Sequence, residues 1–309
     1  MTDANQSDGV NMRPFTSLHQ ALCSLFGSTI RLIRTSRISG GDINDAFCLE
    51  LSDGTVVFMK TNQKEKLSFF TAEAAGLSAI AQTGSIRTPR ILGLGTDADK
   101  GGFSFLLLEY ISGKRRSADY WELFARQLAD MHKADTSGFV SGGIYGFCSD
   151  NYIGAGEQVN TAHHSWTSFF RTCRLEPQFR RAEGYLGTSG IKKALRLLEH
   201  LDSFLEEPPY PSLLHGDLWS GNVITGSDGQ AWLIDPAVSV GHAEADLAMT
   251  ELFGGFAQTF YDAYQEVAPL QPGYRRRRDL YNLYHMLNHL NLFGRTYLGA
   301  VERMMAQYI

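Results

Sequence analysis

The sequence predicts an α+β fold with two lobes, a small one built on an antiparallel sheet and a larger, mainly helical one. Short apolar strands separated by turn residues follow one another between residues 30 and 60. Helical spacing of apolar residues dominates after residue 112. The 309 residues are enough for two lobes with a sizeable core. We therefore expect a disordered polar start at residues 1–12, a sheet lobe at residues 13–111 and a helical lobe at residues 112–309.

Composition and charge exclude several classes of protein. A net charge of −5 gives no case for a nucleic-acid partner. The one basic run, Arg275 to Arg278, is interpreted as the solvated start of a helix, with contact to an acidic partner as the alternative. The four cysteines lack C-x-x-C spacing, which is typical of reduced thiols in the cytoplasm. No apolar run is long enough to span a membrane, and residues 1–11 lack the apolar segment of a signal peptide. We expect a cytoplasmic protein with no membrane partner.

The small lobe is predicted to begin with a helix and three strands. Apolar residues recur at helical spacing from Phe15 to Phe26, and Gly27 ends that segment. Strands are expected at Ile30–Ile38, Ala46–Leu51 and Thr55–Lys60, joined by short turns that make an antiparallel meander.

A glycine-rich turn, residues 40–44, joins the first two of these strands. Without side chains, Gly40 and Gly41 would let backbone N–H groups approach a phosphate, and Asn44 closes the same turn. These three residues are candidates for nucleotide binding. A plain hairpin turn is the alternative, because the pattern is weaker than G-x-G-x-x-G.

A lysine ends the third strand. Lys60 in that position would point into a cleft between lobes, where it could bind the α- and β-phosphates of a nucleotide. The helix expected at Ser68–Gln82 carries Glu73, which could pair with Lys60 and hold it in place. Two unrelated surface charges are the alternative.

The small lobe ends with strands near Ile91–Leu94 and Phe103–Glu109. The chain leaves the second of these at Glu109, Tyr110 and Ile111, and in a kinase this segment would be the hinge between lobes whose backbone binds adenine.

The large lobe is expected to contain helices at Tyr120–His132, Trp166–Leu175 and Ile191–Leu205. Between the first two, Asp135 to Val159 is rich in glycine, serine and aromatic residues. That stretch is either a loop on the substrate side or a folded surface insert.

The stretch His215-Gly216-Asp217-Leu218-Trp219-Ser220-Gly221-Asn222 carries the chemistry. A predicted hairpin follows it and should bring Asp235 close to Asn222. One carboxylate, Asp217, would then stand apart from an Asn/Asp pair that could share Mg²⁺, as phosphoryl transfer from ATP requires.

This spacing matches the catalytic loop and metal-binding aspartate of protein kinases, with H-G-D in place of H-R-D. Simple turn formation by these residues is one alternative. A metal hydrolase is another, but no second His/Asp cluster completes such a site. In a helix starting near Glu244, Asp246 could brace the catalytic loop. His285 and His289 have a metal-like spacing but no accompanying ligand, so we interpret them as helix residues.

The glycine-rich turn, Lys60, Glu73, the hinge, Asp217, Asn222 and Asp235 follow one another in this order along the chain. From about Phe15 onwards, the chain resembles the fructosamine-kinase family, also called ketosamine-3-kinases. The resemblance is strongest in His215–Asn222, which includes Trp219, and in Ala245–Phe256. It implies a protein-kinase-like fold, related to the aminoglycoside and choline kinases. It also implies ATP-dependent phosphorylation of O3 on a ketoamine, the product of sugar and amine, after which the adduct falls off the amine. Bacterial-type members prefer ribulosamines or erythrulosamines to fructosamines.

The resemblance also implies roles by position. Asp217 would orient and deprotonate the sugar hydroxyl, Asn222 and Asp235 would hold Mg²⁺, and Lys60 would bind phosphate. Trp219 offers a flat face for the sugar or amine, with core packing as the alternative. The ketoamine could be a small molecule or part of a glycated protein.

Three further expectations complete the sequence-based account. We expect a monomer or a weak homodimer, because residues 39–44 lack the cysteine that links two chains in some family members. Another small-molecule kinase, such as an aminoglycoside or choline phosphotransferase, is the first alternative function. A catalytically silent nucleotide-binding module is the second.

Overall fold

The computed structural model describes residues 13–38, 43–99 and 102–309. The start of the chain at residues 1–12 and the predicted phosphate-binding glycines Gly40 and Gly41 therefore lie outside the described residues. The chain divides into two compact units. The first contains residues up to 78 and residues 89–112, and the second contains residues 79–88 and 113–309. Residues 79–88, which the sequence analysis assigned to the sheet lobe, group with the second unit.

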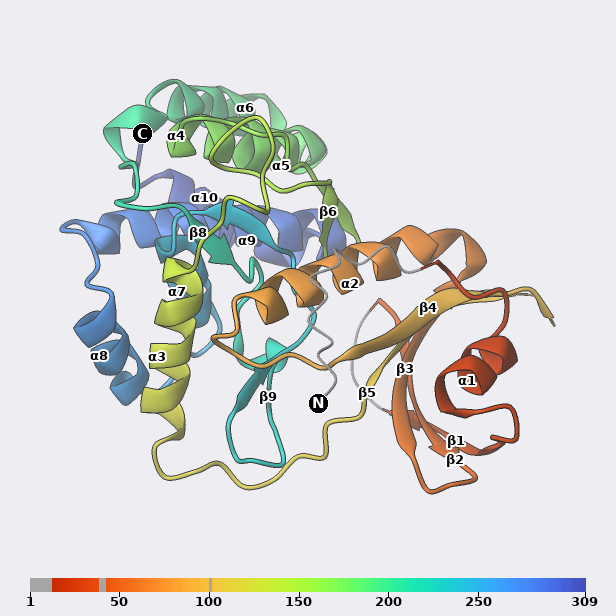
Figure 1. Cartoon of the computed structure of the whole chain (residues 1–309). Helices are drawn as coiled ribbons and strands as arrows, with labels where there is room; N and C mark the ends of the chain where they lie inside the picture. Colours follow the sequence, from red (N-terminus) through yellow and green to blue (C-terminus); the bar gives the residue numbers. More distant parts are fainter. Residues whose placement is uncertain (1–12, 39–42, 100–101) are drawn as a thin grey trace. The chain divides into compact units, whose positions relative to one another are not determined.

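The first unit is built on a five-stranded antiparallel sheet with the order β1-β2-β3-β5-β4, which confirms the predicted antiparallel sheet (Figure 1). Its elements, in chain order, are α1 (Leu18–Phe26), β1 (Leu32–Ile38), β2 (Asp45–Leu51), β3 (Val56–Gln63), a 3-10 turn (Lys64–Lys66), α2 (Leu67–Gln82), β4 (Ile91–Asp97) and β5 (Phe103–Glu109). Strand β3 runs three residues beyond the predicted end at Lys60, because Thr61, Asn62 and Gln63 continue to pair with β5.

A helix packs on each face of this sheet, because successive side chains of a strand point to opposite faces. Leu22 of α1 is buried with Val57 and Met59 of β3. On the other face, Phe70 of α2 is buried with Leu106 of β5. The alternation thus decides which residues of β3 face α2.

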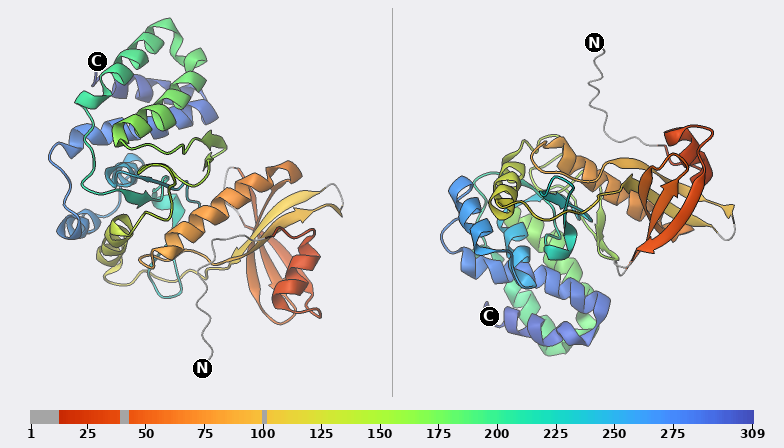
Figure 2. Two further views of the ribbon diagram at one scale, coloured as in Figure 1. Left: turned by 45° about the horizontal axis from the view of Figure 1, so that its top comes forward. Right: turned by 90° about the horizontal axis from the view of Figure 1, so that it is seen from below.

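The second unit is mainly helical, as predicted. Its helices are α3 (Tyr120–Lys133), α4 (Trp166–Phe169), a π-helical segment (Phe170–Leu175), α5 (Glu176–Arg181), α6 (Glu183–Glu199), α7 (Glu244–Leu252), α8 (Gln258–Val267), α9 (Tyr274–Phe293) and α10 (Leu298–Met305), with short 3-10 turns at Leu201–Ser203, Ser220–Asn222 and Arg295–Tyr297. Helix α9 lies at its centre and packs against α5, α7 and α10 (Figures 1 and 2). Along α9, Leu280, Leu283 and Leu287 are fully buried, so this helix forms the middle of the core.

Three two-stranded antiparallel sheets complete the second unit. They pair β6 (Asn151–Ile153) with β7 (Gly156–Gln158), β8 (Ser212–Leu214) with β11 (Ser239–Gly241), and β9 (Val223–Thr225) with β10 (Ala231–Leu233). The β6–β7 hairpin gives structure to the Gly- and Ser-rich stretch that the sequence left as loop or insert. Among the described helices, none is long and apolar enough to cross a membrane.

Candidate active site

Lys60 and Glu73 form the predicted ion pair within the first unit. Side chains alternate along β3: Met59 faces α1, so the next residue, Lys60, lies on the opposite face, which α2 covers. Its Nζ donates to Oε1 of Glu73, on α2, at 2.7 Å. Only 9% and 12% of the two side chains are exposed, so solvent and salt screen this pair much less than a surface pair.

The other nucleotide-binding candidates of the first unit are Asn44 and the segment after β5. Oδ1 of Asn44 accepts a hydrogen bond from Nδ2 of Asn62 at 2.7 Å, which ties the end of the glycine turn to β3. The carboxylate of Glu109 accepts from the backbone N and from Nε of Arg90, at 3.3 and 3.2 Å. The N–H of Glu109 also donates to the carbonyl of Arg90 at 2.9 Å, so the candidates for binding adenine in this segment are the carbonyl of Glu109 and the backbone of Tyr110 and Ile111.

In the second unit, β8 leads into the catalytic stretch, and a close backbone approach explains its H-G-D sequence. Gly216 has a φ of +81°, and a Cβ there would lie 2.0 Å from the carbonyl oxygen of Ala237. Only glycine fits such a position. The N–H of Ala237 donates to the carbonyl of His215 at 2.8 Å, which fastens the loop to the segment after Asp235.

The hairpin that follows has the predicted form. Val223 pairs with Leu233, and the N–H of Ile234 donates to the carbonyl of Asn222 at 3.1 Å. Asp235 therefore comes directly after the residue that is bonded to Asn222. Asp235 is exposed and has a φ of 55°, the one positive φ among the non-glycine residues of the described chain. A strained backbone of this kind is typical of functional positions.

Asn222 fixes the orientation of Asp217. Its Nδ2 donates to Oδ2 of Asp217 at 3.0 Å and to the backbone carbonyl of Asp217 at 2.9 Å. Both donor hydrogens are thereby used, while the amide oxygen Oδ1 of Asn222 accepts no hydrogen bond from the described residues. That oxygen is free to act as a ligand.

Asp217 lies in an environment that favours its protonated form. Burial raises the pKa of Asp217 to about 7, and the negative charges of Asp235 and Asp246 act in the same direction, while the hydrogen bond from Asn222 opposes them. A carboxylate with a pKa near 7 is well matched to accept a proton at neutral pH.

His215 connects the loop at Asp217 with the end of the hairpin at Ile234. Sequence reasoning missed this role. The N–H of Asp217 donates to Nδ1 of His215 at 3.3 Å, and Nε2 of His215 lies 2.9 Å from the carbonyl of Ile234. One ring nitrogen therefore accepts and the other donates, which requires a neutral imidazole. Burial lowers the pKa of His215 and so favours this neutral form. The only sequence signal for this role was the position of His215 two residues before Asp217.

Asp246 braces the loop backbone, which confirms the role expected for it. Its two carboxylate oxygens accept from the N–H groups of His215 and Gly216, at 2.7 and 2.8 Å. Nε2 of His132, on α3, lies 3.2 Å from the same carboxylate, and Nδ1 of His132 lies 2.7 Å from the hydroxyl of Tyr264. Burial opposes ionisation of Asp246, but the hydrogen bonds from His132 and from the backbone N–H of Gly216 favour the carboxylate, and the pKa of Asp246 is lowered. No sequence signal pointed to His132 or Tyr264. His132 is 114 residues from Asp246 and 132 residues from Tyr264.

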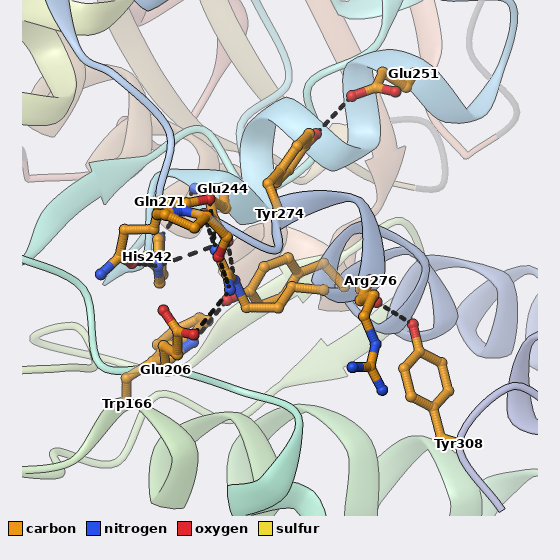
Figure 3. Close-up of polar contacts among 12 residues, drawn as sticks. Trp166, Glu206, His242, Glu244, Glu251, Gln271, Tyr274, Arg276 and Tyr308 are labelled. Carbon is orange, nitrogen blue, oxygen red and sulfur yellow. Dashed lines mark hydrogen bonds and ion pairs between the residues drawn. The ribbon is translucent and has the colours of Figure 1, made fainter.

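A second buried pair holds the start of α7, two residues before Asp246. Nε and Nη2 of Arg277 donate to Oε2 and Oε1 of Glu244, each at 2.7 Å, and both side chains are almost fully buried. Figure 3 shows Glu244 beside His242, whose Nε2 lies 3.1 Å from Oε1 of Gln271. The basic run does begin a helix, α9, but the prediction that it is solvated is wrong for Arg277, because α9 turns this residue towards α7.

Trp219 is an exposed ring in the catalytic stretch. It is 37% exposed, so the core-packing alternative is wrong. A Cβ at Gly221 would lie 2.3 Å from the ring, which shows that the indole folds back over that glycine. The rings of Trp219 and Phe253 are arranged edge to face, with their centroids 6.1 Å apart. The remaining surface of the ring is open to a ligand.

His285 and His289 both lie on α9. Across the described residues, no group of three or more histidine, cysteine, aspartate or glutamate side chains could hold a metal ion. An Mg²⁺ ion at Asn222 and Asp235 would therefore need phosphate oxygens as further ligands, which is usual for this cation in kinases.

The chain is similar to several known proteins. A family model described as fructosamine kinase matches residues 14–309. A Synechocystis protein named as a probable ketoamine kinase is 38% identical, over 95% of this chain and 96% of its own length. A chloroplastic protein-ribulosamine 3-kinase from Oryza sativa subsp. indica is 41% identical, over 92% of this chain and 81% of its own length. The crystal structure of a Haemophilus somnus 129PT protein, provisionally described as a fructosamine-3-kinase, has a TM-score of 0.84 at 29% identity, covering 95% and 97% of the two chains. The predicted protein-kinase-like fold is confirmed.

Proposed function

Because this chain belongs to the fructosamine kinase family, it is an ATP-dependent kinase, and we propose that it phosphorylates the O3 hydroxyl of a ketoamine sugar. The proposed acceptors are ribulosamines, erythrulosamines or fructosamines, carried by a small amine or by a glycated protein. The observation that carries the proposal is the 41% identity, over 92% of the chain, to a relative named as a protein-ribulosamine 3-kinase. The phosphorylated adduct would then leave the amine, so the result is deglycation.

Asp217 is proposed as the catalytic base. Its pKa of about 7 lets a substantial fraction be ionised at neutral pH while the carboxylate remains basic enough to accept the proton of a sugar hydroxyl. Asn222 holds one carboxylate oxygen, which leaves the other free to orient that hydroxyl. The neutral imidazole of His215 keeps the backbone of Asp217 in place from the other side.

Asn222 and Asp235 fit an Mg²⁺ ion. The amide oxygen of Asn222 and the exposed carboxylate of Asp235 are hard oxygen ligands, and the hairpin brings their backbones together. When bound, Mg²⁺ would neutralise charge on the phosphates of ATP. The positive φ of Asp235 supports a role of this residue beyond folding.

Lys60 is proposed to bind the phosphates of ATP, with Glu73 keeping its ammonium in position. Asn44, together with Gly40 and Gly41, is proposed to contribute to the same task. The backbone of Glu109, Tyr110 and Ile111 is proposed to bind adenine.

Trp219 is proposed to carry the sugar. Aromatic rings bind the apolar faces of sugars well, and this ring is exposed two residues from Asp217. Its position beside Gly221 fixes the direction of the ring relative to the proposed base.

A substrate panel tests the proposal. We expect ATP-dependent phosphorylation of ribulosyl-lysine, erythrulosyl-lysine or fructosyl-lysine, and none of kanamycin or choline. Phosphorylation of an antibiotic or of choline without any ketoamine activity would instead support the alternative that the chain is an aminoglycoside or choline phosphotransferase. Thermal stabilisation by Mg²⁺-ATP without turnover of any acceptor would support a silent nucleotide-binding module.

A further inference from the structure

A line of aromatic rings continues from Trp219 across the second unit. We call it the aromatic strip and define it as Trp219, Phe253, His289, Phe293 and Tyr297. The ring centroids of Phe253 and His289 are 5.1 Å apart, and His289 lies 5.5 Å from Phe293 and 5.1 Å from Tyr297. Each ring thus contacts the next, starting at the catalytic loop.

Three of the five rings are exposed although they are apolar, while His289 and Tyr297 are partly buried. Trp219 is 37% exposed, Phe253 is 39% exposed and Phe293 is 49% exposed. Three separate elements supply these rings, namely the catalytic loop, the residue after α7 and the last residue of α9. Exposed aromatic residues that touch one another on a protein surface commonly mark a binding site.

His289 places one hydrogen-bond acceptor in the middle of the strip. Its Nδ1 lies 2.8 Å from the carbonyl oxygen of His285. A carbonyl can only accept, so Nδ1 carries a hydrogen, and in the tautomer with its hydrogen on Nδ1 the other nitrogen, Nε2, is an acceptor. No described residue donates a hydrogen bond to that Nε2. The strip therefore combines ring faces with one acceptor for an N–H group.

We propose that the aromatic strip binds the amine-bearing half of the ketoamine, namely the secondary ammonium and methylene stem of a lysyl side chain within a polypeptide. This assignment rests on the proposed function, because the sugar hydroxyl must lie at Asp217 and the sugar on Trp219. The rest of the substrate then continues along the rings that contact Trp219.

The chemistry of the strip suits this occupant. An ammonium group is attracted to aromatic faces, here that of Phe253, and it can donate to Nε2 of His289. A methylene stem gains from apolar contact, and Phe293 and Tyr297 supply that contact further along. A free sugar or a short alkylamine would reach only the first rings.

Two substrates that share a sugar test the assignment. The kcat and KM values would be measured for ribulosyl-methylamine and for an acetylated, amidated tripeptide carrying ribulosyl-lysine. In Phe293→Ala, the ratio of kcat/KM for the peptide to that for the methylamine should fall about fivefold, as expected for loss of about 1 kcal/mol of contact. Leu195→Ala on α6, which removes an exposed side chain of 55% exposure, should leave this ratio unchanged.

A second pair of variants tests the acceptor. His289→Leu should raise KM for both ketoamines, and His289→Gln, which keeps an acceptor oxygen, should restore most of the loss. An equal rise in KM for His289→Leu and His289→Gln would overturn the role of Nε2.

The possible failures can be told apart. If wild-type protein phosphorylates no ketoamine, the proposed function fails and this assignment fails with it. If ketoamines are phosphorylated but Phe293→Ala leaves the ratio unchanged, only the assignment is overturned. A change in sedimentation of Phe293→Ala without a change in the ratio would assign the strip to contact between two copies of the chain and would also overturn it.

Discussion

Replacing Asp217 by asparagine is expected to abolish phosphoryl transfer while making the protein more stable at alkaline pH. Burial raises the pKa of this carboxyl from 3.8 to about 7, so the folded protein binds the proton more tightly than the unfolded chain. The contribution of Asp217 to stability is therefore largest below pH 3.8 and declines as the pH rises through 7. Asparagine does not ionise, so the variant escapes this decline. It also keeps an oxygen that can accept from Asn222.

The size of the effect follows from the two pKa values. Relative to low pH, where Asp217 is protonated in both states, its raised pKa lowers the free energy of unfolding by about 2 kcal/mol at pH 5.5 and by about 4 kcal/mol at pH 8.5, because the unfolded chain ionises more readily. The difference in unfolding free energy between the asparagine variant and wild type should thus grow by about 2 kcal/mol between these pH values. Taking the difference between two pH values removes any constant change in packing that the substitution causes.

Urea unfolding of both proteins at pH 5.5 and 8.5 measures this quantity, and Asp130→Asn, at an exposed position on α3, serves as the control. The control should show no pH-dependent difference of this size. If the Asp217→Asn difference is the same at both pH values, Asp217 ionises in the folded protein as it does in water, and the reasoning about its pKa is refuted.

Four other outcomes are expected. Asp217→Ala should lower kcat by about 10²- to 10⁴-fold but leave ATP affinity, measured by calorimetry, nearly unchanged, because the base acts on the acceptor; undiminished turnover would contradict its role. In wild type, kcat/KM for the ketoamine should rise with pH and level off above an apparent pKa near 7, because the base must be unprotonated; a flat profile from pH 5.5 to 8 would argue against it. Lys60→Met should weaken ATP binding by about tenfold through loss of a charge-assisted hydrogen bond, and equal affinity would remove Lys60 from the site. Arg277→Met should destabilise the protein by about 3–5 kcal/mol in urea unfolding, because it leaves Glu244 buried without its partner; a loss below 1 kcal/mol would show that water reaches Glu244.

Features set by local pattern could be predicted from the sequence. The hairpin after Asn222 needed only two short apolar runs and a turn, and its pairing is the one expected. Lys60 and Glu73 were predicted to pair because one ends a strand and the other lies on the next helix. Asp246 was expected to reach back to the loop because it lies in the first turn of the helix that starts near Glu244.

Features set by distant packing could not be predicted. The contact between His132 and Asp246 joins residues 114 positions apart, and nothing local distinguishes His132 from any other histidine at a helix end. Arg277 was predicted to be solvated because basic runs usually are, but Glu244 makes its burial favourable. Strand β3 extends past Lys60 because β5 offers further partners, which the polar residues 61–63 do not reveal.

Phosphorus and proton NMR of the product formed from ribulosyl-lysine and ATP is the most direct test of the proposed activity. We predict that a phosphate appears on O3 of the sugar and that free lysine amine is then released as the adduct decomposes. Phosphate on another hydroxyl, or consumption of ATP with the ketoamine left intact, would contradict the proposed function.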